Sequence, residues 1–333
     1  MVHCVIRATK LRPSITFCCM GRVILETHLR PMKLQNSNYN STLLLFVLFL
    51  AITSCSKLER KVDFQGHRGA RGLYPENSLE GFEYALSIEE VTTLELDVVV
   101  SADKNLIISH EPWLNPEICA LDSAVLADNP MAYNLYKMTT EEIQAFDCGS
   151  KGNPRFPEQK AMATYKPSLS ELFNMLSRTG NWRKLNIETK SRPIGDGVYH
   201  PKPKEFARLI ATFLERYDAL NPEFNLFDLV TIQSFDVRTL QELRKLHTGV
   251  KLCLLTEDET DPAAAMDKLG FPADVYSPNF ETVTPEIVNW CHFRRIDIIP
   301  WTVNEVADMQ RLLDMGVDGL ISDYPNKYKE LVY

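Results

Sequence analysis

The sequence predicts a mixed α/β fold, a TIM-type (β/α)8 barrel, and three observations support that prediction. Eight short runs of apolar and β-branched residues recur along the chain. Helical patterns separate most neighbouring runs, which favours parallel strands joined by crossover helices. Eight is also the number of parallel strands that closes such a barrel, and 333 residues leave room for one.

The expected elements follow one another in a regular order. Strands are expected at residues 64–67, 92–97, 185–190, 229–234, 252–255, 274–277, 296–302 and 317–322. Helices are expected at residues 78–88, 169–176, 203–214, 237–245, 263–269, 284–290 and 305–315. The alternation predicts that the barrel occupies residues 62–333.

A hairpin interrupts the alternation after the second strand. The apolar run NLIISH follows that strand after only a short turn. Since parallel neighbours need a crossover of roughly a dozen residues, this run is expected to pair antiparallel. The register sets Ser101 opposite Asn105 and Asp97 opposite Ser109. His110 therefore returns to the neighbourhood of Asp97.

Residues 111–167 are expected to form a loop subdomain inserted after the hairpin. They are rich in proline and show little periodicity beyond residues 139–146. Long segments of this kind commonly lie over the active face of a barrel. Cys119 and Cys148 both lie in the insertion, and we expect them to form a disulfide if the protein is exported.

The first 55 residues differ from the rest of the chain. Residues 43–52 (LLLFVLFLAI) are apolar but too few for a membrane span, which needs roughly 20. They suit a signal peptide, and the following Ile-Thr-Ser-Cys resembles a bacterial lipobox. Residues 32–55 are thus expected to be a lipoprotein signal with Cys55 acylated, which predicts an exported protein anchored to the bacterial cell envelope. A plain signal peptide is the alternative, and residues 1–31 are expected to be a misassigned start.

The charge distribution argues against nucleic acid as a partner. Of 36 Lys+Arg and 44 Asp+Glu, six and one lie in residues 1–54, which leaves the remainder at net charge −13. Phosphate backbones require a basic face on the protein. An acidic barrel instead suits a site where carboxylates converge on a cation.

Carboxylates at the ends of two expected strands predict a metal site. Glu95 and Asp97 are two residues apart and so point to one face of their strand. Glu188, in the run NIETK, can supply a third ligand. An all-carboxylate set suits Ca²⁺ or Mg²⁺. Solvated acids on the outer face are the alternative, but helices cover the outer face of such barrels.

Two histidines and two cations are expected beside these carboxylates. His67 ends the first strand and His110 ends the hairpin, so both imidazoles can exchange protons at the barrel mouth. Arg68 and Lys190 supply positive charge for an anionic phosphoryl group.

The loop after the first strand has glycines in the spacing GxxGxxG, which differs from the dinucleotide-binding GxGxxG. We expect its glycines to turn the backbone so that His67 and Arg68 face inward. Glu76 is expected to face the pocket, with Asn77 or Ser78 as the N-cap of the next helix.

The motifs GHRGARGLYPENS, LELDV, IISHE, NIETK, TIQSF, PWTVN and VDGLISDYP resemble, in order, the signature of the glycerophosphodiester phosphodiesterase family. The resemblance covers residues 64–325. It implies a TIM barrel that hydrolyses glycerophosphodiesters to sn-glycerol 3-phosphate and an alcohol. It also implies one divalent ion and two catalytic histidines.

By motif, the resemblance assigns catalysis to His67 and His110 and metal binding to the carboxylates above. The substrate-binding candidates are Arg68, Lys190, Glu76, Gln233 and Trp301, of which Trp301 would line the glycerol side. Glu111 departs from the family, which usually has Asp after the second histidine. The insertion that follows shapes the exit for the leaving alcohol, so the resemblance does not assign an alcohol preference.

Two other functions remain open. One is a phospholipase-C/D-like phosphodiesterase that acts on lysophospholipid or phosphoinositide head groups. The other is an inactive lipoprotein that binds glycans or lipid head groups, although the intact histidines, carboxylates and lysine argue against it.

Overall fold

The computed structural model describes residues 61–129 and 132–333. The expected start at residues 1–31, the signal at residues 32–55 and Cys55 lie outside the described residues. Within the described ranges, no helix combines the length and apolar character needed to cross a membrane.

The strands form one nearly closed parallel barrel, in the order β8-β7-β6-β5-β4-β2-β1-β9. Their bounds are β1 (Asp63–Gly66), β2 (Thr93–Val100), β4 (Lys184–Thr189), β5 (Val230–Ser234), β6 (Lys251–Thr256), β7 (Val275–Pro278), β8 (Asp297–Ile298) and β9 (Gly319–Ser322). Two backbone hydrogen bonds tie the ends of this order together, from Asp318 N to Ile298 O (2.9 Å) and from Ile321 N to Pro300 O (3.1 Å). The predicted TIM-type barrel is confirmed.

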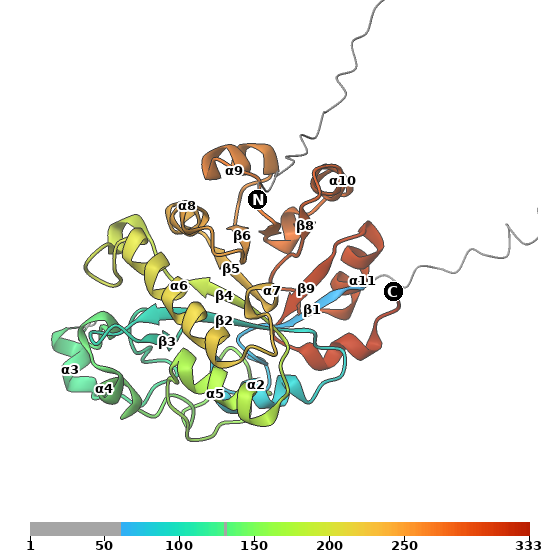
Figure 1. Ribbon diagram of the computed structural model, residues 1–333. Helices are drawn as coiled ribbons and strands as arrows, with labels where there is room; N and C mark the ends of the chain where they lie inside the picture. The colour runs from blue at the N-terminus through green and yellow to red at the C-terminus, as the bar shows by residue number, and fades with distance from the viewer. Residues whose placement is uncertain (1–60, 130–131) are drawn as a thin grey trace, which may run out of the picture. The chain divides into compact units, whose positions relative to one another are not determined.

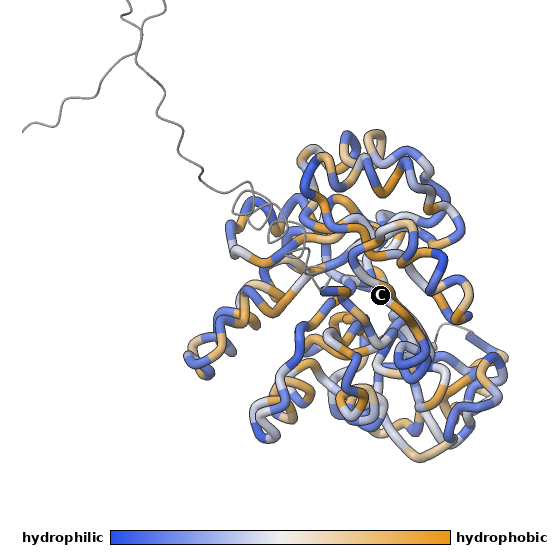
Figure 2. The backbone as a smooth tube through the Cα atoms, turned by 90° about the vertical axis from the view of Figure 1, so that its right-hand side faces the viewer, coloured by the Kyte–Doolittle hydropathy of each residue, from blue (hydrophilic) through white to orange (hydrophobic). Residues whose placement is uncertain are grey.

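Amphipathic helices cover the outside of the barrel (Figure 1). They are α2 (Leu79–Leu86), α5 (Leu169–Thr179), α6 (Pro203–Leu220), α7 (Leu226–Leu229), α8 (Val237–Leu246), α9 (Pro262–Leu269), α10 (Pro285–Phe293) and α11 (Val306–Met315). Helix α5 shows how the sequence sets their limits. Ser168 and Glu171 form a capping box at its start, and Gly180 ends it in the left-handed conformation (φ 65°). Hydrophobic and hydrophilic residues alternate along the helices (Figure 2), as expected for helices with one buried face.

The hairpin has the predicted register. Strand β3 (Leu106–Ile108) pairs antiparallel with β2, with Val98 opposite Ile108. Ser109 N donates to Asp97 O at 3.0 Å. His110 therefore lies one residue beyond the main-chain partner of Asp97.

The described part of residues 111–167 contains two short helices, α3 (Ser123–Asp128) and α4 (Thr140–Gln144), and the 3-10 turn η1 (Leu135–Lys137). They lie beyond β3 at one side of the barrel (Figure 1). A small second core holds them, and it comprises Val99, Ile107, Leu114, Ile118, Cys119, Leu135, Ile143 and Cys148. Cys119 and Cys148 form a disulfide, as predicted.

Two details differ from the sequence prediction. The expected strand at 296–302 is regular only in β8, which ends before Pro300, a residue without an N–H donor. Helices α3 and α7 are too short to show a helical period in the sequence. The remaining 3-10 turns are η2 (Pro193–Gly195), η3 (Phe280–Thr282) and η4 (Pro325–Glu330).

The barrel interior is divided into a polar and an apolar side. Leu94 and Leu96 of β2 belong to the outer core, so the alternating Glu95 and Asp97 point inward. Across the barrel, Cys253, Val275, Ile299 and Ile321 form an interior apolar cluster with Trp301 packed against it. The charged side chains therefore gather on the side of β1, β2 and β4.

Candidate active site

The loop after β1 is shaped by close backbone approach. A Cβ on Gly66 would collide with Gly69 O, and one on Gly69 (φ 84°) would lie 2.8 Å from the Gly81 backbone in α2. Arg68 (φ 50°) and Asn77 (φ 56°) adopt the left-handed conformation, which is uncommon outside glycine. The glycines thus let the loop fold against α2, and Arg68 N donates to Glu95 Oε2 at 2.8 Å.

Ser78, rather than Asn77, caps helix α2, because its hydroxyl accepts from Gly81 N at 3.0 Å. Asn77 instead forms hydrogen bonds with strand β2. Its Nδ2 donates to Asp97 Oδ2 at 2.8 Å, and its Oδ1 accepts from Asp97 N at 3.3 Å. Asn77 therefore holds Asp97 at both its side chain and its backbone.

Glu95, Asp97 and Glu188 converge at the carboxyl ends of β2 and β4. A ligand oxygen from each lies within 4.8 Å of the others, and all three residues are buried. The strand register accounts for the convergence, since Asp97 and Glu188 are direct neighbours across the β2–β4 pair. The three predicted metal ligands thus form one cluster.

The cluster fits a divalent cation. Asp97 Oδ1 is buried and has no hydrogen-bond partner among the described residues, and Lys190 Nζ lies 3.5 Å from it. An unpaired buried carboxylate oxygen is a ligand available to a metal ion. Around the site, carboxylates outnumber basic side chains: Glu76, Glu95, Asp97, Glu111, Glu188 and Asp323 against Arg68, Arg71, Lys166 and Lys190. A bound divalent cation would offset that excess.

Burial and mutual repulsion separate the pKa values of the three carboxylates. Burial, reinforced by Asp97, raises the pKa of Glu95 well above its usual range. Burial likewise raises the pKa of Glu188 to about 7 against the opposing effect of Lys190. For Asp97, burial is outweighed by Arg68 and Lys190, so its pKa falls well below the usual range. Glu188 and Glu95 therefore hold protons more tightly than ordinary carboxylates.

His67 is held by a carboxylate from the last strand. Its Nδ1 lies 2.6 Å from Asp323 Oδ1, and its Nε2 lies 3.9 Å from Glu95 Oε2. Asn304 Nδ2 donates to the other Asp323 oxygen at 2.8 Å. Burial lowers the pKa of His67 below 6.5, although Asp323 opposes the shift. A neutral His67 that donates Nδ1–H to Asp323 presents Nε2 as a proton acceptor beside the carboxylate cluster.

His110 has a similar arrangement on the hairpin side. Its Nδ1 lies 2.8 Å from Glu111 Oε1. Burial, together with Lys190 and Arg68, lowers the pKa of His110, while Asp97 and Glu111 oppose the shift. The His110 side chain remains 31% exposed, so this imidazole can be reached from solvent. Both predicted histidines thus border the cluster, each with its own carboxylate.

Arg68, Arg71 and Lys190 are held in ion pairs. Arg68 Nη1 lies 3.1 Å from Glu76 Oε1, and its Nε lies 3.2 Å from Asp97 Oδ2. Lys190 Nζ donates to Glu188 Oε1 at 2.7 Å. Glu76 also binds Arg71 Nε at 2.8 Å. Burial would raise the pKa of Glu76, but Arg68 and Arg71 hold it far below its usual range, so Glu76 stays ionised.

Gln233 belongs to a chain of amides inside the barrel. Its Nε2 donates to Glu95 Oε1 at 2.8 Å, and its Oε1 accepts from Asn186 Nδ2 at 3.0 Å. Asn186 Nδ2 also lies 2.8 Å from Gln65 Oε1, and Gln65 Nε2 donates to Asp63 at 3.2 Å. These bonds fix the Glu95 carboxylate from the barrel core.

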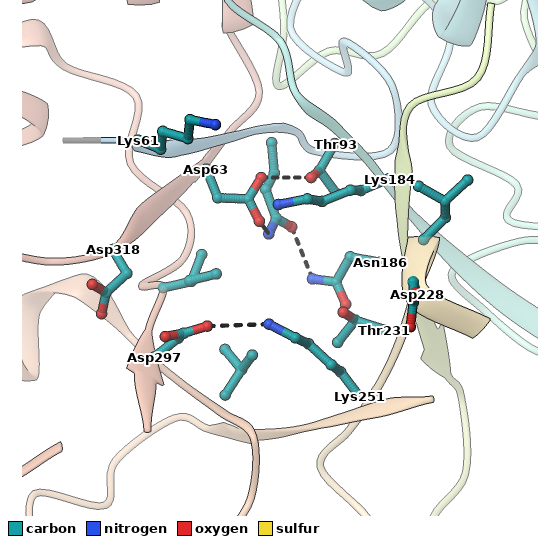
Figure 3. Close-up of a pocket in the computed structure, with 14 residues that line it drawn as sticks. Lys61, Asp63, Thr93, Lys184, Asn186, Asp228, Thr231, Lys251, Asp297 and Asp318 are labelled. Atoms are coloured by element: carbon teal, nitrogen blue, oxygen red, sulfur yellow. Dashed lines mark hydrogen bonds and ion pairs between the residues drawn. The ribbon is translucent and has the colours of Figure 1, made fainter. Parts of the chain in front are cut away.

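The chain of amides ends at a hollow of about 200 Å³ at the opposite, amino-terminal end of the barrel (Figure 3). Both lysines and aspartates line it, and Lys251 Nζ lies 3.4 Å from Asp297 Oδ2. Active sites of such barrels occupy the carboxyl-terminal face. The amino-terminal hollow therefore lies away from the histidines.

Trp301 lies on the segment after β8, on the apolar side of the mouth. Its Nε1 donates to Ser277 O at 2.9 Å, and its ring meets Phe235 edge-to-face at 5.4 Å. Trp301 is thus placed away from the β2–β3 side, which carries His110.

Sequence reasoning missed Asp323, Asn77, Arg71 and Asn186 as partners of the site residues. Asp323 follows the last strand directly. The rule that polar residues at strand ends form the site, applied to this strand, would have found it. The sequence around Asn77 predicts only a helix cap, and no local pattern marks a cap residue as a carboxylate partner.

Comparison with known proteins shows to which protein family the chain belongs. Residues 67–327 match the sequence profile of the Glycerophosphoryl diester phosphodiesterase family. The chain belongs to this family. A glycerophosphodiester phosphodiesterase of Bacillus subtilis is 27% identical over 270 residues, which cover 80% of this chain and 84% of the relative. One from Caldanaerobacter subterraneus is 27% identical over 266 residues, which cover 80% and 96%.

Solved structures agree with the glycerophosphoryl diester phosphodiesterase assignment. A Silicibacter pomeroyi structure assigned to this activity is 28% identical, with a TM-score of 0.70 over 82% of this chain and 93% of that one. An Oleispira antarctica phosphodiesterase, determined with the product sn-glycerol-3-phosphate, shares the fold (TM-score 0.63, 20% identity, 80% and 95% coverage). This member of the family is therefore a phosphodiester hydrolase built on a TIM barrel.

Proposed function

We propose that this phosphodiesterase hydrolyses glycerophosphodiesters to sn-glycerol 3-phosphate and an alcohol, with one divalent cation, Ca²⁺ or Mg²⁺. The observation that carries the proposal is the buried cluster of Glu95, Asp97 and Glu188 between two histidines, each hydrogen-bonded to a carboxylate. Carboxylates that hold a cation beside two neutral imidazoles suit acid–base cleavage of an anionic diester.

The cation and the basic residues act on the phosphoryl group. A divalent cation held by the three carboxylates would neutralise charge that develops on the phosphoryl oxygens. Arg68 and Lys190 bind the same anionic oxygens, and their ion pairs with the carboxylates fix their positions. Trp301 lines the side of the pocket that receives the glycerol.

The two histidines transfer protons. The glycerol 2-hydroxyl is adjacent to the phosphorus, so its attack gains a large effective concentration. As its oxygen bonds to phosphorus, the bond to the leaving alcohol breaks, one histidine takes the hydroxyl proton, and the other protonates the alkoxide. Water then opens the resulting 1,2-cyclic phosphate to sn-glycerol 3-phosphate.

Turnover with and without a chelator tests the proposed activity. The purified protein should hydrolyse a glycerophosphodiester such as glycerophosphocholine, lose activity in EDTA and regain it with Ca²⁺ or Mg²⁺. Glu95→Gln and Asp97→Asn should each lower metal affinity, because an oxygen ligand is lost, whereas the exposed Glu158→Gln should not. Faster release of a lysophospholipid or phosphoinositide head group would favour the alternative substrate class.

A 2-deoxy substrate tests the route. The analogue should bind but turn over at a small fraction of the normal rate, because it lacks the attacking hydroxyl. Normal hydrolysis of the analogue would exclude the cyclic route and leave direct attack by water.

A lipid anchor is also proposed. Acylation of Cys55, supported by the lipobox-like sequence before it, would hold the enzyme at the bacterial cell envelope.

A further inference from the structure

Lys166 is a buried cation with no use in the chemistry described above. The residue is 2% exposed, and its Nζ has no hydrogen-bond partner among residues 61–129 and 132–333. Leaving a buried ammonium without a partner is costly, since it loses its hydration and gains nothing in return. A partner that arrives from outside the protein would remove that cost.

Backbone pairing places Lys166 at the barrel mouth. Its segment continues the sheet beside β3, with Ile107 opposite Ser168 and Ile108 N donating to Pro167 O at 2.8 Å. The same register sets Lys166 beside Ser109, the residue that precedes His110. Side chains opposite one another in antiparallel strands share a face, and this face is the one that Asp97 presents to the site.

The electrostatics agree with this position. Burial would raise the pKa values of Glu76 and Glu111. Arg68 and Arg71 lower the pKa of Glu76, the hydrogen bond with His110 lowers that of Glu111, and Lys166 makes a smaller contribution to both. The two Glu76 oxygens already bind Arg68 and Arg71. Glu111 uses only Oε1, toward His110, and its Oε2 is buried without a partner in the described part of the chain. Lys166 Nζ and Glu111 Oε2 are thus a buried donor and a buried acceptor near His110 that have no hydrogen-bond partner among the described residues.

We propose that Lys166 and Glu111 Oε2 form a subsite for a hydroxyl group on the leaving alcohol of the substrate. A hydroxyl can accept from Nζ and donate to Oε2 at once, so it would satisfy both groups. The subsite lies on the hairpin and insertion side, next to His110, while Trp301 lies beyond β1 and β9 in the ring of strands. This inference rests on the proposed function.

The subsite distinguishes between alcohols. A second glycerol, or another polyol, carries hydroxyls that can fill it. Choline, once esterified, has no free hydroxyl, and its trimethylammonium group would lie near the Lys166 ammonium while satisfying neither partner. The enzyme should therefore prefer glycerophosphoglycerol to glycerophosphocholine.

The test compares kcat/KM for these two diesters in the full-length wild type, Lys166→Met and Lys160→Met. Lys160 is an exposed lysine of the same insertion and serves as the matched control. Lys166→Met should lower kcat/KM for glycerophosphoglycerol by about 10- to 100-fold, the value of a hydrogen bond to a charged group, and that for glycerophosphocholine much less. Lys160→Met should leave both values near those of wild type.

Each other outcome overturns the inference. Equal losses on both diesters, or no loss on either, would make Lys166 a structural residue, and wild-type preference for glycerophosphocholine would exclude the hydroxyl subsite. If thermal unfolding shows that Lys166→Met does not fold, the same comparison of kcat/KM for the two diesters is made with Lys166→Gln. If the wild type hydrolyses neither diester, the proposed function itself is refuted.

Discussion

The chemistry at the scale of single residues depends on which imidazole nitrogen of each histidine is free. Asp323 and Glu111 both contact Nδ1, which leaves Nε2 of His67 and His110 to act on the substrate in the proposed mechanism. The two carboxylates differ in their surroundings. Asp323 is 3% exposed and is itself held by Asn304, whereas the Glu111 side chain is 21% exposed and keeps one oxygen unpaired. His67 is consequently the more rigidly oriented of the two.

Asp323→Asn should impair catalysis without impairing metal binding. The amide cannot stabilise a protonated His67 and can favour the wrong tautomer, so kcat should fall by roughly 10² to 10⁴. Calorimetric titration with Ca²⁺ or Mg²⁺ should give an affinity near that of wild type, because Asp323 is not a ligand. Asp314→Asn, on the exposed side of α11, is the control. Unchanged kcat in Asp323→Asn would remove Asp323 from the mechanism.

The raised pKa of Glu188 predicts a link between pH, metal and stability. With a pKa of about 7 against an ordinary 4.5, Glu188 keeps a proton in the folded, metal-free protein that the unfolded chain releases. The folded state binds more protons between these values, so this group makes the free energy of unfolding fall as pH rises from 5 to 8. Since a metal ligand must be deprotonated, stabilisation by Ca²⁺ should grow over the same range.

Thermal unfolding at pH 5 and pH 8, with and without Ca²⁺, measures this link. The lowered pKa values of His67 and His110 act in the opposite direction, so the comparison is between wild type and Glu188→Gln. The metal-free wild type should lose more stability than the variant as pH rises. Parallel curves for the two proteins would contradict the shifted pKa.

At the scale of elements, the strand ends explain why so much of the site could be predicted. Two-residue alternation in LELDV fixes Glu95 and Asp97 on one face, and hairpin register brings back His110 without any knowledge of packing. The partners of these residues could not be predicted in the same way. Asn77 reaches Asp97 only because Gly66 and Gly69 fold their loop onto α2, a contact between segments that no local pattern encodes.

The inserted segment should depend on its disulfide. Its core is small, and Cys119 and Cys148, separated by 29 residues, belong to it. The Cys119→Ser, Cys148→Ser double variant should lose roughly 3–4 kcal/mol in the chain-entropy estimate for such a loop. Chemical denaturation with and without reductant measures the loss. The reductant should destabilise the wild type and leave the double variant unchanged, and equal sensitivity of the two would contradict the prediction.

At the scale of the whole molecule, the barrel could be predicted because short apolar runs typical of strands alternate along the chain with apolar patterns of helical period. The way in which the barrel closes between β8 and β9 could not be predicted. Only residues 297–298 of the expected strand at 296–302 are regular, and the barrel is closed there by hydrogen bonds to Ile298 O and Pro300 O. Pro300 cannot donate, so the sequence alone does not show how this segment would pair.

The acidic barrel is expected to need a lipid anchor to reside at a membrane. Residues 55–333 carry a net charge of −13, once the six basic and one acidic residues before them are set aside, so an anionic membrane surface would repel the barrel. Attachment would then require acyl chains on Cys55, and two or more chains anchor stably where one does not.

Wild-type protein expressed in a bacterium should sediment with membranes and be released by detergent but not by high salt. Cys55→Ser should move to the soluble fraction or remain unprocessed, while Cys291→Ser, at a free cysteine of the barrel, should sediment as wild type does. A soluble wild type would refute the lipid anchor and favour a plain signal peptide.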